Sequence, residues 1–181
     1  MAHKLDAVDI PSFAATQLAL LAAEQASEIA ETSTLISAHA PSSLQRAGVA
    51  LTNLVVSSRR TGLGGKTVIE LAPDPAVSSS PSSGGGGGFE LPEHGIRTGD
   101  IVLVSEQPAG SAKKREVKEL ERKGAKGVVT RVRREDIGVA LDGEGDEGGG
   151  LGGRVWCVKV ADDVTFKRMN QTMEKLQAMG E

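Results

Sequence analysis

Residues 49–72 read VALTNLVVSSRRTGLGGKTVIELA, which is the pattern of two short strands joined by a turn. The two ends of this stretch, Val49–Ser57 and Lys66–Ala72, are rich in Val, Leu and Ile, a composition that favours β-strands. The residues between them, RRTGLGG, supply three glycines, which adopt the backbone conformations that tight turns need. We therefore predict a β-hairpin at this place in the chain.

Four more strands are predicted on the C-terminal side of the hairpin, at residues 100–105, 127–133, 137–141 and 154–160. Together, the six strands predict a six-stranded antiparallel β-barrel within residues 44–160. Lys113–Lys123, in a mostly charged segment, is compatible with a short solvated helix. Flexible loops are predicted at residues 73–96, which include five consecutive glycines, at the charged residues 106–124, and at the acidic, glycine-rich residues 142–153.

Helical periodicity flanks the strands on both sides. After a loose tail at residues 1–10, we predict a long helix over residues 11–40, which are rich in Ala, Leu, Glu and Gln. Pro41 ends this helix, because proline lacks the N–H group that a helix interior requires. A second helix is predicted over residues 162–180, with Asp162 or Asp163 as its cap.

Each predicted helix has an apolar stripe that it cannot bury by itself. Pairing the two helices antiparallel buries both stripes, so we predict a two-helix stalk. The predicted fold class is therefore α+β, a six-stranded antiparallel barrel on an antiparallel helical stalk. The stripe residues expected to meet are Leu18, Leu21, Ile29 and Leu35 on the first helix and Phe166, Met169, Met173 and Leu176 on the second.

Composition narrows the class of protein. Aromatic residues make up 2% of the 181 residues, so the core must be built from Val, Leu, Ile and Ala. Cys157 is the single cysteine, which excludes a disulfide within the chain, and we expect it to be a buried core thiol. No apolar run fits a signal peptide or a membrane span, so we expect no membrane partner and a location in the nucleus, the cytoplasm or both.

The turn of the hairpin ends like a phosphate-binding P-loop, whose pattern is G-x-x-x-x-G-K-[ST]. The first glycine of that pattern would fall at position 60, where the chain has Arg60. A P-loop also opens a helix, so that helix N–H groups face the phosphate. Because Val68–Leu71 has the composition of a strand, we predict a hairpin turn here.

No other catalytic or metal-binding pattern is found in the sequence. His3, His39 and His94 are scattered and lack the spacing of metal ligands. The acidic residues within 142–147 lack the ligand order of a calcium loop, so a solvated loop is predicted there. We therefore expect no catalytic residue, no metal and no cofactor in this chain, and no enzyme activity of the chain alone.

Positive charge is concentrated in one part of the chain, although the net charge is −3. Between Lys113 and Arg134 there are ten Lys or Arg residues and three Glu, which gives a local net charge of +7. Such asymmetry favours a face that attracts phosphates. The other interpretation is a charged segment that is merely well solvated. The scarcity of aromatic residues disfavours base stacking as the main contact with nucleic acid.

Six stretches of the chain, in this order, resemble the N-terminal part of superfamily 1 helicases of the immunoglobulin mu-binding protein type. Fungal relatives of these proteins are called DNA polymerase alpha-associated DNA helicase A. The resemblance covers nearly the whole chain, and its last stretch is the most specific, because it joins the final strand to the second helix. The stretches are LQRAGV at 44–49, SRRTGLGGK at 58–66, GDIV at 99–102, GVVTRV at 127–132, VALD at 139–142 and VKVADDVTFKRM at 158–169.

In that family the corresponding segment is the 1B region, a β-barrel held by stalk helices above the first motor domain. The resemblance implies an accessory domain that covers single-stranded DNA or RNA on a motor that hydrolyses ATP and moves 5′ to 3′. ATP and Mg²⁺ are implied only for the motor domains, whose P-loop has no counterpart before Glu181. The implied partners are the strand and the motor domains, with replication or ribosome-associated proteins as further candidates. The alternative is a freestanding barrel that acts as a protein-interaction module.

Phosphate contact requires flexible cations on a surface that can lie along a strand of nucleic acid. Because side chains alternate along a β-strand, Arg131 and Arg133 are predicted to share one face, opposite Val132. The other interpretation is that the arginines pair with the acidic residues 142–147 and only hold the surface together. The candidate nucleic-acid-binding residues are Arg59, Arg60 and Lys66 at the hairpin, and Arg131, Arg133 and Arg134 at the fourth strand.

Overall fold

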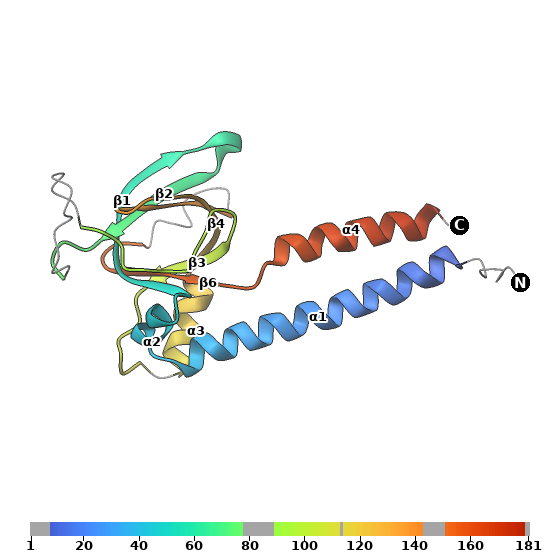
Figure 1. Ribbon diagram of the computed structural model, residues 1–181, viewed down its shortest axis with the longest axis horizontal. Coiled ribbons are helices and arrows are strands. Elements are labelled where there is room, and N and C mark those ends of the chain that lie inside the picture. Colours follow the sequence, from blue (N-terminus) through green and yellow to red (C-terminus); the bar gives the residue numbers. More distant parts are fainter. Residues whose placement is uncertain (1–7, 78–88, 113, 143–150, 180–181) are drawn as a thin grey trace, which may run out of the picture. The chain divides into compact units, whose positions relative to one another are not determined.

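The computed structural model describes residues 8–77, 89–112, 114–142 and 151–179. It consists of two compact units, a barrel unit over Ser33–Val160 and a helical unit formed by the described residues on either side (Figure 1). The predicted tail up to residue 7, the glycine run at 84–88 and most of the predicted acidic loop lie outside the described residues.

Six antiparallel strands close into a barrel in the order β1-β2-β5-β4-β3-β6, which confirms the predicted six-stranded antiparallel barrel. The predicted hairpin is the pair β1–β2. The other neighbours along the sheet are not all neighbours in sequence, since β2 pairs with β5 and β3 pairs with β6. The strands are β1 Ala50–Thr61, β2 Thr67–Pro73, β3 Ile101–Glu106, β4 Ala125–Val132, β5 Ile137–Leu141 and β6 Val155–Lys159.

The hairpin turn is shorter than predicted. β1 continues through Arg59 and Arg60 to Thr61, which pairs with Thr67 of β2, so these residues belong to the strand and not to the turn. The turn itself is a short 3₁₀ segment, η1 Leu63–Gly65, with positive φ at two glycines. The predicted hairpin turn is confirmed, because the segment after the turn is the strand β2 and not the α-helix that follows a P-loop.

The inside of the barrel is filled by apolar side chains from all six strands and by Ile96 from the segment before β3. Cys157 lies in this core and is fully buried, as predicted. Burial raises the pKa of the Cys157 thiol to about 12, because an apolar surrounding disfavours the charged thiolate. This thiol is therefore unreactive while the barrel stays folded.

A second apolar cluster lies on the outside of the barrel. β6 alternates, so that Trp156 faces outward between the inward-facing Val155 and Cys157, and the Trp156 Nε1–H donates to Ser105 Oγ at 2.8 Å. Trp156 packs there with Ile36, Leu44 and Val117. These come from the last turns of α1 Ile10–Ala38, from α2 Pro41–Arg46 and from α3 Lys114–Lys123. The charged helix predicted inside residues 106–124 is therefore present as α3, and one side of it is anchored.

In the helical unit, α1 and α4 Asp163–Met179 are both capped by aspartate, which accepts hydrogen bonds from N–H groups of the first turn. Asp9 accepts from the Ser12 N–H at 3.1 Å. Asp162 accepts from the N–H groups of Val164 and Thr165, both at 3.1 Å. The hydrogen bond from the Thr165 hydroxyl, followed by these N–H contacts, lowers the pKa of Asp162. Among the described residues, no helix is both long and apolar enough to cross a membrane.

The two helices of this unit run in opposite directions (Figure 1). Each helix has one side that is less exposed than the other. On α4 this side contains the four predicted residues, and Phe166 is buried. On α1 it contains the predicted Leu18 and Leu21, but Ile29 and Leu35 are 47% and 42% exposed, so their predicted burial is wrong. Glu28, seven residues after Leu21, is on the less exposed side of α1, so Ile29 is turned away from that side by one residue. Leu35 lies in the part of α1 that belongs to the barrel unit, and there the neighbouring Ile36 is the buried residue.

Candidate nucleic-acid interface

Four neighbouring strands place one residue each in a row on the outer surface of the barrel, and three of these residues have polar side chains. Ser58 of β1 pairs with Glu70 of β2, Glu70 pairs with Gly138 of β5, and Gly138 pairs with Arg131 of β4. Residues that are directly opposite in a sheet have their side chains on the same face. The sheet register therefore brings Glu70 and Arg131 to the same place, although they are 61 residues apart in sequence. We call Ser58, Glu70, Gly138 and Arg131 the barrel row.

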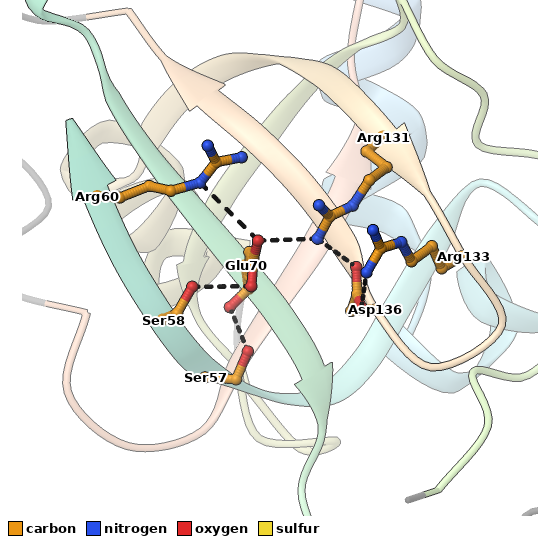
Figure 2. Close-up of polar contacts among 7 residues, drawn as sticks. All are labelled: Ser57, Ser58, Arg60, Glu70, Arg131, Arg133 and Asp136. Atoms are coloured by element: carbon orange, nitrogen blue, oxygen red, sulfur yellow. Dashed lines mark hydrogen bonds and ion pairs between the residues drawn. The ribbon is translucent and has the colours of Figure 1, made fainter. Parts of the chain in front are cut away.

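Glu70 is the centre of the barrel row (Figure 2). Its Oε1 accepts a hydrogen bond from Arg131 Nη2 at 2.8 Å, and its Oε2 accepts from Ser58 Oγ at 2.8 Å. Arg60 Nε lies farther away, 3.9 Å from Glu70 Oε1. The hydrogen bonds from Ser58 and Arg131 lower the pKa of Glu70, because both favour the carboxylate form. Glu70 is therefore ionised at neutral pH and engaged on both oxygens.

Gly138 makes the contact between Arg131 and Glu70 possible. It stands between them in the row and has no side chain that could block the guanidinium. A Cβ atom at this position would lie 3.1 Å from Thr130 Oγ1 and 3.5 Å from Arg131 Cβ. The barrel row therefore needs glycine here for space, since the φ of Gly138 is not in the positive region.

Asp136 joins two of the predicted arginines. Its Oδ1 accepts from Arg131 Nη2 at 3.0 Å, and its Oδ2 lies 3.8 Å from Arg133 Nη1. Arg131 and Arg133 therefore share one face, as strand alternation predicted, while Val132 packs against the barrel core. Arg131 is 32% exposed and held by two carboxylates, which raise its pKa, whereas Arg133 is 61% exposed.

The other predicted cations do not join this row. Lys66 Nζ lies 3.0 Å from Asp142 Oδ1, and Arg134 Nε lies 3.9 Å from Glu90 Oε1, with the Arg134 side chain 86% exposed. Arg59 pairs with the buried Ile69, so it starts from the opposite face of β1 to Arg60. The alternative pairing predicted for the arginines concerned residues 142–147; Asp142 lies beside a lysine, Lys66, and residues 143–147 lie outside the described part.

A groove of about 820 Å³ is lined by two of the predicted cations and by a further cation that was not predicted. Arg46 at the end of α2 lines it together with Arg133, Arg134 and residues 90–94. Two backbone hydrogen bonds hold residues 90–94 in place. The Leu91 N–H donates to the Arg134 carbonyl at 2.6 Å, and the Gly95 N–H donates to the Gly48 carbonyl at 2.8 Å. His94 also lines the groove, and burial lowers its pKa, which favours the neutral imidazole at pH 7.

Sequence reasoning missed the partners of the arginines and the role of Arg46. Glu70 was recognisable only as a lone acid inside an apolar strand, and Asp136 only as a residue of the turn before β5. No signal in the sequence placed Arg46 beside Arg133. Within the described residues, no group of three His, Cys, Asp or Glu side chains is arranged to hold a metal ion.

The exposed arginines beside the barrel row are suited to binding an anion. Ion pairs on a protein surface contribute at most about 1 kcal/mol, so a phosphate can replace a long, exposed pair at little cost. Arg133 and Arg134, with pairs of 3.8 and 3.9 Å, meet this condition, as does Arg60 at 3.9 Å. Arg131 does not, because its two partners lie at 2.8 and 3.0 Å.

Comparison with known proteins places this surface in a family. Residues 14–151, which include all the cations above, match the family model described as Helicase SMUBP-2/HCS1, 1B domain. The chain is 37% identical over 169 residues to the DNA polymerase alpha-associated DNA helicase A of Schizosaccharomyces pombe, covering 93% of this chain and 24% of that protein. It is 31% identical over 173 residues to the DNA-binding protein SMUBP-2 of Mus musculus, covering 93% and 15% of the two chains.

A third relative is the DNA polymerase alpha-associated DNA helicase A of Saccharomyces cerevisiae, 29% identical over 164 residues that cover 84% of this chain and 22% of the relative. The chain thus spans about a quarter or less of the length of these relatives. The family match extends over both the barrel row and the groove that Arg46 lines. With this match over most of its residues, the chain belongs to the helicase SMUBP-2/HCS1 1B-domain family.

Proposed function

We propose that this chain is the nucleic-acid-binding accessory domain of an ATP-dependent helicase that moves 5′ to 3′ on DNA or RNA. In this proposal the barrel covers the single strand that the motor domains hold, and ATP and Mg²⁺ are bound by the motor domains. The observation that carries the proposal is the match of residues 14–151 to a helicase 1B domain. The names of the relatives, a DNA helicase and a DNA-binding protein, support it.

The surface chemistry supports contact with phosphates more than with bases. Arg60, Arg133 and Arg134 have exposed guanidinium groups that can donate to phosphate oxygens. Trp156 and Phe166, two of the four aromatic side chains, are buried and cannot stack on bases. The expected binding is therefore independent of base sequence and strongly dependent on salt.

The test uses this chain alone and grafted in place of the matching segment of the Schizosaccharomyces pombe helicase. Binding of labelled oligothymidylate and oligouridylate is measured by fluorescence anisotropy over a range of salt concentrations. The double variant Arg133→Gln with Arg134→Gln should bind more weakly and reduce the salt slope by about 1.4, since each lost phosphate contact on a single strand removes about 0.7.

Arg131→Gln serves as the matched control. It removes the same kind of charge, but from a side chain that two carboxylates already neutralise, so it should lower thermal stability and leave the salt slope nearly unchanged. The proposal fails if neither the chain nor the graft binds single strands in a salt-dependent way. Retained, salt-insensitive binding to a protein partner would instead support a protein-interaction module.

A further inference from the structure

A second cationic groove, of about 640 Å³, lies on the barrel unit between α3 and the last turns of α1. Four cations of α3 line it, together with one acid, Glu119, and two hydroxyl residues of α1, Thr34 and Ser37. The four cations are Lys114, Arg115, Lys118 and Arg122. We call this the α3 groove. None of its residues belongs to the barrel row or to the groove lined by Arg46.

The packing of α3 fixes which side of the helix faces the groove. Val117 is buried in the outer apolar cluster with Trp156, which anchors one side of α3 to the barrel. The cations lie on another side, and Lys114, Lys118 and Arg122 follow one another at intervals of four residues. Four residues rise about 6 Å along a helix, so these side chains form a ridge with a short, regular spacing.

These four cations differ from Arg131, Arg133 and Arg134, each of which lies near a carboxylate. Among the described residues, no ion pair or side-chain hydrogen bond is found for Lys114, Arg115, Lys118 or Arg122. Lys118 has an electrostatic neighbour in Glu121, which is half-buried. Burial raises the pKa of Glu121, and the charge of Lys118 opposes that rise only in part. With four cations and one acid, Glu119, in its lining, the α3 groove therefore holds an excess of positive charge.

We propose that the α3 groove binds the phosphate backbone of a single strand of nucleic acid. Successive cations on the ridge, about 6 Å apart, are close enough for neighbouring phosphates of one strand to reach them. The hydroxyl groups of Thr34 and Ser37, on the opposite wall, are of the kind that contacts phosphate and sugar oxygens in nucleic-acid complexes. This proposal rests on the proposed function and adds a contact surface to it.

The chemistry of the lining favours nucleic acid over a protein partner. Protein interfaces are depleted in charged residues at their centre and enriched in aromatic and apolar side chains. The α3 groove has no apolar side chain in its lining, only cations, hydroxyls and Glu119. A cluster of cations without apolar residues among them is the arrangement that binds a phosphate backbone without regard to sequence.

The test compares two lysines of the same helix. Lys118→Gln removes one charge from the groove, and Lys123→Gln removes one charge from an exposed lysine of α3 that does not line it. At about 0.1 M salt, the loss of one phosphate contact should weaken oligothymidylate binding about fivefold and lower the salt slope by about 0.7. Lys123→Gln should leave both values close to those of the unchanged chain.

The triple variant Lys114→Gln, Lys118→Gln, Arg122→Gln removes three charges from the groove. It should bind oligothymidylate about a hundredfold more weakly and lower the salt slope by about 2. Circular dichroism with thermal melting checks that α3 and the barrel stay folded in each variant. An unchanged affinity of the folded triple variant overturns the inference. If Arg133→Gln with Arg134→Gln still weakens binding in that case, the proposed function stands without the α3 groove.

Three further outcomes also test the proposal. Equal losses in Lys118→Gln and Lys123→Gln would mean that only the overall charge matters, which overturns a local site. Polyglutamate that competes as well as an oligonucleotide of equal charge, and that the triple variant no longer binds, would assign the groove to acidic proteins. If the unchanged chain and the graft bind no strand, the proposed function fails together with the inference.

Discussion

The barrel row and the α3 groove carry positive charge in the same domain, but their surroundings differ. In the barrel row, Arg131 is held by Glu70 and Asp136 at 2.8 and 3.0 Å. In the α3 groove, Lys118 and its neighbours have no ion pair within the described part of the chain. In the sequence Arg131 and the four cations of α3 belong to one basic run between Lys113 and Arg134.

The difference follows from the kind of element that carries each cation. A strand in a closed barrel has two neighbours, and these can bring an acid from far along the chain, as β2 brings Glu70 to Arg131. A helix on the surface offers its outward side chains only the neighbours of its own turns, unless another element covers it. Cation counts along a sequence therefore overestimate the charge available on strands more than on solvated helices.

The largest expected effect on stability comes from the outer apolar cluster. This cluster contains Val117 of α3 and no residue of the barrel row. Trp156→Ala removes a fully buried side chain and should lower the free energy of unfolding by about 3–5 kcal/mol, measured by urea denaturation. Trp156→Phe keeps most of the volume but loses the hydrogen bond to Ser105, so its loss should be smaller. Equal losses in the two variants would contradict this account of the cluster.

A smaller effect on stability is expected from filling the space at Gly138, between Arg131 and Glu70. Gly138→Val places branched carbons where even a Cβ lies 3.1 Å from Thr130 Oγ1, so the variant should be less stable by about 1–3 kcal/mol. Gly138→Ala should have a milder effect, because only one atom must fit. The measurement is again urea denaturation, and a valine variant as stable as the unchanged chain would show that the barrel row does not need this space.

The smallest expected effect is the pH dependence that Glu70 adds. Its pKa in the folded chain is lowered from the ordinary value of 4.5, so the fold binds fewer protons than the unfolded chain near that pH. The stabilisation by the carboxylate is therefore complete above about pH 4.5 and is lost as the pH falls through the folded pKa. No such loss occurs for the amide in Glu70→Gln.

The thermal midpoints of the unchanged chain and of Glu70→Gln, compared from pH 7 to pH 3, test this expectation. The difference should be constant at the upper end of that range and shrink toward zero at the lower end. A difference that stays constant down to pH 3 would show that Glu70 is not the group that titrates. Lys118→Gln, which touches no acid of the barrel row, should leave the pH profile unchanged.

The sequence by itself determined the elements and the family. Strands of Val, Leu and Ile, glycine-rich turns and two helices with apolar stripes predicted the barrel and the flanking helices, because local composition and side-chain period follow from the backbone geometry of each element. Arg60 at the first glycine position and the strand after Lys66 excluded a P-loop for the same local reason. The resemblance to a helicase 1B region is confirmed by the family match.

Which cations have partners depends on how the strands and helices pack in the folded chain. The pairing of β2 with β5 and of β5 with β4 sets Glu70 and Arg131 in one row, and no local pattern specifies such a strand order. In the same way, the burial of Val117 against Trp156 turns the cations of α3 toward Thr34 and Ser37. Charge depends on residue type and is visible in a sequence, whereas neutralisation depends on distance, which only folding sets.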